Sequence, residues 1–218
     1  MNLTASNEGQ DSYCGDIEKL PYIHQRAGLV LSDEQIGQFL STDDLVAMFD
    51  LFWLDEAWSP LFAFGEPLPA HQLGLQGDEL LYLSSRVIPM GWQNATGVAQ
   101  YLMRQLALHS YRLSRCLPPG REIRRDLILP RLECLPGDAE GIVIIWLAYL
   151  DGLDLEEFVE ALEASWFSLT EMSSHQEHFQ ATVLKWNAPL HPTKSETRKV
   201  IGKRLGVALT GAGHRQSF

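Results

Sequence analysis

The feature that most constrains the fold is the apolar run from Ile142 to Leu150, which reads Ile-Val-Ile-Ile-Trp-Leu-Ala-Tyr-Leu. Its length and its β-branched residues favour a buried strand. Asp151-Gly152 follows directly and is typical of a tight hairpin turn, from which Leu153 to Leu155 can return as a short strand. The run therefore predicts a hairpin that fixes the Asp151 carboxylate at a solvent-accessible turn. An ordinary structural turn is the alternative interpretation of the same dipeptide.

The remaining patterns predict a mixture of helices and strands. Capping residues and helical spacing indicate helices, and short apolar or β-branched runs between Gly and Pro residues indicate strands. The expected helices are Ser32 to Leu40, Thr96 to Ser114, Glu156 to Ala164 and Ser173 to Trp186, and the expected strands include Leu61 to Phe64, Glu79 to Ser84 and Leu205 to Thr210. Without regular alternation of strand and helix, this order predicts an α+β fold.

Length and composition predict one domain. The chain has 218 residues and 45% hydrophobic content, enough for a single core. Residues 1–30 show no sustained period and are expected to be a poorly ordered acidic lead-in, followed by a domain over 31–213 and a tail over 214–218. No run of about 18 apolar residues occurs. We therefore expect no membrane association and an intracellular protein, cytoplasmic or nuclear.

The charge is unevenly distributed. A net charge of -11 argues against a general nucleic-acid binder, because phosphate contacts need a basic surface. From Met1 to Pro60 there are eleven acidic residues and two basic ones, whereas Lys185 to Phe218 holds seven basic residues and one acid. The basic segments are either solvated faces or a surface for a nucleic-acid backbone.

Five segments together resemble those of a known enzyme family, and Val87 to Ala95 is the most specific match. Val87 to Ala95, continuing to Gln100, resembles the reverse-transcriptase segment in which a Pro-x-Gly turn opens a helix with a later glutamine. Tyr149 to Gly152 resembles the Tyr-x-Asp-Asp hairpin of that family, with glycine in place of the second acid. Thr42 to Leu45, with Phe49 and the segment Pro60 to Phe64, is similar to the first catalytic strand, while Trp186 to Lys194 and Leu205 to Val207 are similar to the lysine-bearing segment and the primer-grip hairpin.

These segments occur in the family's order over roughly residues 42–213. The chain thus resembles the palm domain of a reverse transcriptase, an RNA-directed DNA polymerase, of a gypsy-like long-terminal-repeat retroelement. The resemblance implies an antiparallel palm sheet backed by helices, with fingers and thumb truncated. It implies two-metal nucleotidyl transfer with Mg²⁺ or Mn²⁺, an RNA or DNA template-primer and deoxynucleotides as partners, and the rest of a polyprotein as a further partner.

The resemblance also implies roles for single residues. Asp44 and Asp151 are expected to be the catalytic, metal-binding pair, with Asp43 as the nearest rival of Asp44. Lys194 is expected to supply a cation to the pyrophosphate leaving group, or else to be one solvated lysine. The residues expected to bind the nucleotide are Phe49, Met90, Gly91, Trp92, Gln100 and Tyr149. Plain core packing is the alternative for Phe49.

Several departures from the family pattern bear on activity. Gly152 removes one carboxylate, for which Asp154 could compensate in part. Only 43 residues precede Asp44, too few for full fingers, and Arg26 is the only nearby arginine. We therefore expect a fragment of a polyprotein or a decayed copy. The alternatives are a catalytically dead remnant that acts at most as a nucleic-acid or protein binding module, and an unrelated small α+β protein.

Overall fold

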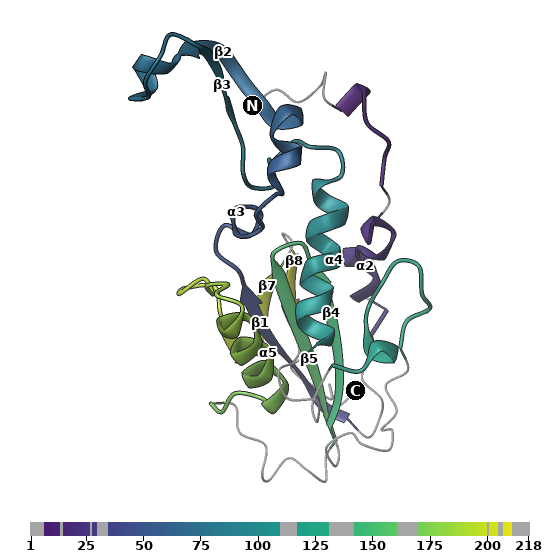
Figure 1. Ribbon diagram of the computed structural model, residues 1–218. Helices are drawn as coiled ribbons and strands as arrows, with labels where there is room; N and C mark the ends of the chain where they lie inside the picture. The colour runs from purple at the N-terminus through teal and green to yellow at the C-terminus, as the bar shows by residue number, and fades with distance from the viewer. Residues whose placement is uncertain are drawn as a thin grey trace.

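The body of the protein is a four-stranded antiparallel sheet with the strand order β4-β5-β1-β6 (Figure 1). The computed structural model describes residues 7–13, 15–26, 28–29, 35–109, 117–130, 142–160, 170–199, 201–204 and 207–210. The strands of the sheet are β1 (Gln35–Asp44), β4 (Ile142–Tyr149), β5 (Gly152–Glu160) and β6 (Glu196–Lys199). In the described residues, helices and antiparallel strands are combined without βαβ units, so the α+β prediction is confirmed.

The predicted hairpin at Asp151 is confirmed. Strands β4 and β5 pair from Ile142 to Tyr149, and Leu150 and Asp151 form the two-residue turn between them. Leu150 has a φ of 49°, in the left-handed region that such tight turns use. Strand β5 runs on to Glu160, so the helix expected to begin at Glu156 is wrong; residues 161–169 lie outside the described part.

The helix expected over Ser32 to Leu40 is also wrong. The described part of this segment belongs to β1, which pairs antiparallel with β5 from Gln35 opposite Glu160 to Asp44 opposite Gly152. An interior position in a sheet supplies backbone hydrogen bonds on both edges, and this tertiary pairing outweighs a local helix-start pattern.

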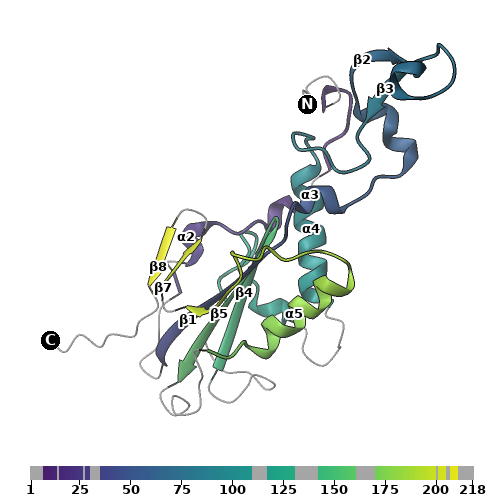
Figure 2. The same cartoon turned by 90° about the vertical axis from the view of Figure 1, so that its left-hand side faces the viewer.

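Two helices cover one face of the sheet (Figure 2). They are α4 (Ala95–Leu108) and α5 (Ser174–Lys185). Met103 of α4 and Phe179 of α5 are buried against Trp146 of β4 in the larger apolar core. Both helices were expected; residues 110–116, where α4 was expected to continue, lie outside the described part.

The N-terminal segment covers the opposite face. It contains a short 3-10 turn, η1 (Ile17–Lys19), and one helical turn, α2 (Ile23–Arg26). Leu29 packs with Ile123 and with the alternate side chains of β4 in a second apolar cluster. This packing differs from the poorly ordered lead-in that the sequence predicted, and the contacts that hold it are mostly polar, as shown below.

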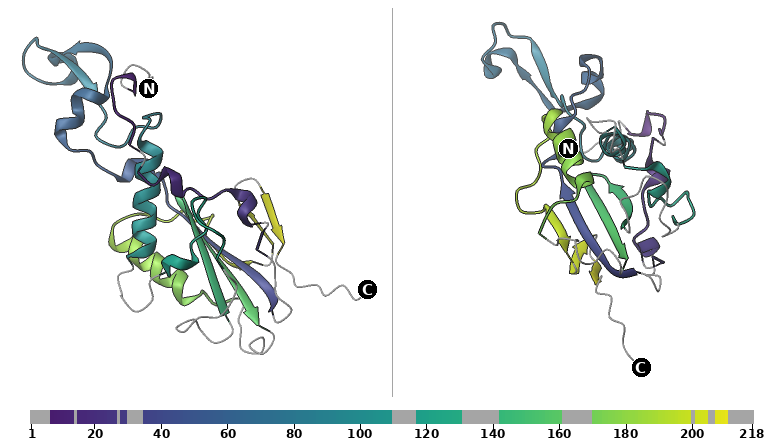
Figure 3. Two further views of the ribbon diagram at one scale, coloured as in Figure 1. Left: turned by 90° about the vertical axis from the view of Figure 1, so that its right-hand side faces the viewer. Right: turned by 90° about the horizontal axis from the view of Figure 1, so that it is seen from below.

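A ribbon of two strands projects away from the sheet (Figure 3). It consists of β2 (Ala63–Pro69) and β3 (Leu80–Ser84). The elements around it are α3 (Met48–Leu51), η2 (Glu56–Phe62) and η3 (Ala70–Leu73). The prediction for β3 is confirmed, whereas the strand expected from Leu61 begins at Ala63, after a 3-10 segment.

Three short elements complete the described chain, namely η5 (Pro119–Arg121), β7 (Ile201–Arg204) and β8 (Val207–Thr210). Strands β7 and β8 form a separate two-stranded sheet. Among the helices in the described ranges, none has the length and apolar character needed to cross a membrane.

Candidate functional site

The end of β1 meets the β4–β5 turn. Asp44 is the last residue of β1 and lies opposite Gly152, the first residue of β5. The backbone N–H of Leu45 donates a hydrogen bond of 2.7 Å to the carbonyl oxygen of Asp151. The two acids that the sequence predicted as a pair, 107 positions apart in the chain, are therefore brought to neighbouring positions at one end of the sheet.

Lys194 contacts this pair. Its Nζ lies 3.3 Å from Oδ2 of Asp44, and about half of the lysine side chain is exposed while Asp44 is buried. The segment before it crosses the end of β1, since the backbone N–H of His191 donates to the carbonyl oxygen of Asp44 at 2.7 Å. A single short crossing thus supplies a cation to the buried carboxylate.

Asp43, the rival candidate, points the other way. Successive side chains of a strand alternate between faces, and Asp43 accepts a hydrogen bond of 2.7 Å from Nε2 of Gln180 on α5. Burial raises the pKa of Asp43, against the lowering effect of hydrogen bonds from Ser195, Gln180 and Gln176. Asp43 belongs to the helix-covered face, and Asp44 lies on the face where β5 carries Asp154.

Gln100 holds the hairpin in place. Its side chain is fully buried, and its Nε2 donates to the carbonyl oxygen of Ala148 at 2.8 Å. Its Oε1 accepts from the backbone N–H of Leu150 at 2.9 Å. Gln100 was predicted to bind the nucleotide, and in the structure its amide holds the end of β4 and the first residue of the turn that carries Asp151. Tyr149, also predicted to bind nucleotide, is half-buried against the cluster around Ile145.

The turn before α4 contains three predicted residues with different environments. Met90 is 75% exposed. Gly91 has a φ of 97°, a conformation that favours glycine, and nothing lies within 4 Å of the position of a Cβ there. Trp92 is buried, with its ring edge-on to Phe62 at a centroid distance of 5.4 Å. The turn therefore exposes backbone and one flexible side chain on an aromatic support.

Phe49 is the second residue of α3, five positions after Asp44, the last residue of β1. Its half-buried side chain contacts both the core beneath α4 and the aromatic cluster around Phe62. The structure shows the packing role that was the alternative for this residue. A nucleotide-binding role for Phe49 stays a prediction.

The N-terminal segment forms hydrogen bonds with the Gly91 turn that the sequence did not predict. Asn7 donates from Nδ2 to the carbonyl oxygen of Gly91 at 2.9 Å and accepts from the backbone N–H of Gln93 at 3.0 Å. Gln10 accepts from Nε1 of Trp92 at 2.7 Å. We call the described residues 7–13, 15–26 and 28–29 the strap. Isolated Asn and Gln residues have no periodicity, so no pattern in the sequence identified these contacts.

The strap continues onto the sheet through buried ion pairs. Nη1 of Arg26 lies 2.8 Å from Oδ2 of Asp154, and its Nε lies 2.6 Å from Oε1 of Glu156. All three side chains are almost completely buried. Burial raises the pKa of Glu156, although Arg26 and Gln38 act to lower it. Arg26, the arginine that the sequence placed near the site, is thus engaged in ion pairs with two residues of β5. One of them is Asp154, which was expected to replace the carboxylate missing at Gly152, and its side chain is already paired with Arg26.

A second buried ion cluster ties the strap to α4. Arg104 pairs with Asp16 of the strap and with Glu122. Burial acts to raise the pKa of Asp16, but hydrogen bonds from Lys19 and Arg104 outweigh it and hold that pKa below its usual value. Gly15 packs directly on α4, where a Cβ would lie 2.9 Å from the backbone of Gly97. A side chain at position 15 would push the strap off the helix.

The pair Asp44 and Asp151 offers only oxygen donors, which suit Mg²⁺ or Mn²⁺. Among the residues that the structure describes, no group of three or more His, Cys, Asp or Glu side chains is arranged to hold a metal ion. Two carboxylates fit a site at which substrate phosphates and water complete the coordination. A cation at Asp44 would compete with the Lys194 ammonium.

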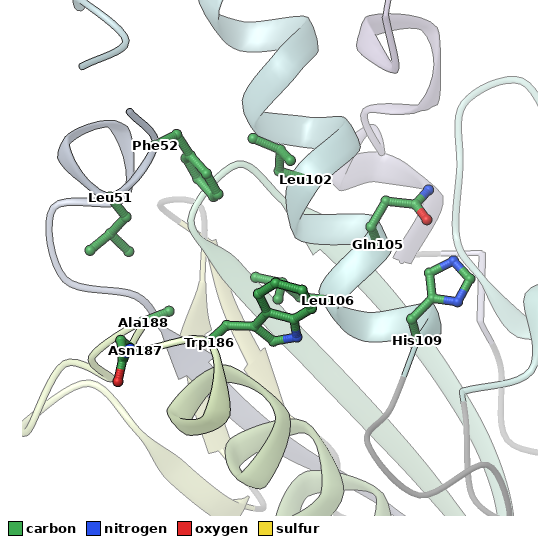
Figure 4. Close-up of a pocket in the computed structure, with 9 residues that line it drawn as sticks. All are labelled: Leu51, Phe52, Leu102, Gln105, Leu106, His109, Trp186, Asn187 and Ala188. Atoms are coloured by element: carbon green, nitrogen blue, oxygen red, sulfur yellow. The ribbon is translucent and has the colours of Figure 1, made fainter. Parts of the chain in front are cut away.

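A cavity of about 490 Å³ lies apart from this site, between α3, α4 and the residues after α5 (Figure 4). Its lining is mainly apolar and includes Leu102, Leu106 and Trp186. None of the residues predicted as catalytic or nucleotide-binding lines it.

Comparison with known proteins gives no family for the chain. No protein-family model matches it, and a search of curated proteins finds no match.

Proposed function

We propose that the chain is a palm-type domain of a retroelement reverse transcriptase, whose reaction is RNA-directed DNA synthesis by two-metal nucleotidyl transfer. One observation carries the proposal. The hydrogen bond from Leu45 to Asp151 sets the end of β1 against the β4–β5 turn, so that Asp44 and Asp151 are neighbours. Acids on adjacent strands that meet in this way are what phosphoryl transfer with metal ions requires.

The surrounding groups have matching chemistry. The Lys194 ammonium beside Asp44 would hold a proton and a positive charge for the departing pyrophosphate. The Gly91 turn would bind the nucleotide through its backbone after Asn7 releases the Gly91 carbonyl oxygen, and nothing lies within 4 Å of the position of a Cβ there. Gln100 would keep Asp151 in register by fixing the hairpin. Bound Mg²⁺ would neutralise the phosphate charge.

A catalytically silent remnant is the second candidate. It is favoured by Gly152, which leaves two carboxylates at the site, and by the strap, which occupies the Gly91 carbonyl oxygen and pairs with Asp154. In this version the fold would serve as a nucleic-acid or protein binding module.

The test is Mn²⁺ binding to the full chain, followed by primer extension. We expect Asp44→Asn and Asp151→Asn each to weaken Mn²⁺ binding by about tenfold or more, since each removes a charged ligand. Asp50→Asn, an exposed acid on α3, is the matched control and should bind as the parent does. Equal binding in all four proteins would overturn the metal site.

Primer extension then separates the two candidates. The assay uses an RNA template, a DNA primer and deoxynucleotides with Mg²⁺ or Mn²⁺. Extension that Asp44→Asn abolishes supports the polymerase. Metal binding without extension identifies the silent remnant.

A further inference from the structure

The β2–β3 ribbon exposes an unusual amount of apolar surface. Leu80 is 65% exposed and Tyr82 is 62% exposed, and Trp53, Leu61, Phe64, Leu75, Leu83 and Met90 are further exposed apolar residues of the same region. An isolated two-stranded ribbon is marginally stable in water, and contiguous exposed apolar side chains mark interaction surfaces. The ribbon therefore has the properties of a surface that a partner covers.

The direction of the ribbon's backbone groups follows from its hydrogen bonds. At the base of the ribbon the backbone N–H of Ser85 donates to the carbonyl oxygen of Phe62 at 3.1 Å. At its far end the backbone N–H of Ala70 donates to the carbonyl oxygen of Glu79 at 2.8 Å. Hydrogen-bonded and non-hydrogen-bonded pairs alternate along antiparallel strands. With the observed register, the backbone groups of residues 81 and 83 face β2, and those of 80, 82 and 84 face outward.

The two outer edges of the ribbon differ sharply. On β2 the outward positions next to Leu68 are Pro67 and Pro69, which have no N–H to offer, and Gly65 has a φ of 77°. Proline on an edge strand prevents pairing with another chain. On β3 the outward positions are Leu80, Tyr82 and Ser84, none of them proline, and within the described residues no other strand pairs with this edge. One edge is blocked and the other is available.

Charge and shape indicate what the open edge accepts. From Leu54 to Arg86 the chain has five acidic residues and one basic one, Arg86. A second copy of the ribbon would bring like charges together, whereas a basic segment would be attracted. Beside the edge lies a hollow of about 440 Å³ lined by Ser59, Pro60, Ala63, Tyr82 and Ser84. Such a hollow suits an apolar side chain of an added strand.

We infer that the outer edge of β3 is a docking edge for an extended, basic polypeptide segment of another protein, which adds to the ribbon as a third strand. Main-chain hydrogen bonds to residues 80, 82 and 84 provide the pairing, the hollow takes alternate apolar side chains, and the acidic residues around the ribbon select positive charge. The inference does not depend on the polymerase proposal, because the ribbon contains neither Asp44 nor Asp151.

The test uses the full chain and a labelled peptide of alternating lysine and valine, with a glutamate–valine peptide as the charge control. Hydrogen exchange with the bound lysine peptide should newly protect the amides of Leu80, Tyr82 and Ser84. The Tyr82→Pro variant removes one outward N–H and no bond to β2, and should weaken binding by about tenfold. Tyr82→Phe, which keeps that N–H, should bind within about twofold of the parent.

Four results would overturn the inference. They are equal binding of the two peptides, parental affinity in Tyr82→Pro, protection at amides outside β3, and self-association without peptide that Tyr82→Pro abolishes. The last result would identify a second copy as the occupant. Because hydrogen exchange is measured on the unaltered protein, it decides the question even if the proline variant does not fold.

Discussion

On one face of the sheet, α4 and α5 cover β4 and β5 with side chains such as Met103, Phe179 and Val183, all fully buried among other apolar groups. On the other face the strap has no long helix, and charged and amide groups hold it. Apolar contacts have no required direction and tolerate small shifts. Buried ion pairs stabilise only while every charge keeps its partner.

The two faces therefore differ in what is lost when the segment that packs on each of them detaches. Detaching a helix exposes the main core and amounts to unfolding the protein. The strap is held by a few hydrogen bonds, by Leu29 and by the two ion clusters. When it detaches, the hydrogen bonds and the charged groups can exchange their partners for water, and the apolar surface of Leu29 is the main loss. The strap contacts the carbonyl oxygen of Gly91, and it pairs with Asp154 on the face of the sheet that also carries Asp44. The three predictions that follow test this comparison.

The largest effect is expected for Arg26→Met. The change leaves Asp154 and Glu156 buried without their cation, and losing one partner of a buried pair costs about 3–5 kcal/mol. Urea unfolding at neutral pH measures the loss. Adding Asp154→Asn and Glu156→Gln to the variant should recover a large part of it, because no buried charge then remains. A loss below about 1 kcal/mol for Arg26→Met would show that the pair is solvated.

Met103→Ala should destabilise the helix-covered face by about 2–5 kcal/mol, from lost apolar burial and the cavity left behind. Here the loss should be independent of pH between neutral and mildly acidic conditions, unlike that of Arg26→Met. Hydrogen exchange should show the same decrease in protection in α4, α5 and β4. A decrease confined to α4 would mean that this face does not open as one unit.

The smallest effect is expected from acid. The folded-state pKa of Asp16 is lowered, so its stabilising contribution is present above the unfolded value of about 3.9 and is lost as the pH falls through the folded value. Glu156 has a raised pKa and the opposite sign, because its protonation favours the folded state as the pH falls. Asp16→Asn should therefore flatten the acid side of the stability curve. If the loss of stability at low pH were the same in Asp16→Asn as in the parent, Asp16 would be excluded as the cause of that loss.

The sequence predicted the elements whose signal is local. The apolar run before Asp151 identified the hairpin, and the helical spacing after Asn94 identified α4. For both elements the residues that carry the signal lie within one element or one short segment.

The sequence failed where distant partners decide the structure. Glu156 and Glu157 suggested a helix, but Arg26 and Arg198 neutralise them within β5. The strap has the composition of a disordered segment because its stability comes from single polar contacts with residues about 80 or more positions away. Single contacts between residues that are distant in the chain produce no periodic pattern from which they could be predicted.

The aromatic cluster at the base of the ribbon has a mechanical consequence. Trp92 meets Phe62 and Trp58 edge-on, with centroid distances of 5.4 and 5.7 Å, and the ribbon begins directly after Phe62. Packed rings resist compression, so a torque applied to the ribbon passes through Trp92 to the neighbouring Gly91. Trp92 therefore joins the base of the ribbon to the turn that carries Gly91, so that a force on the far end of the ribbon would be transmitted to this turn.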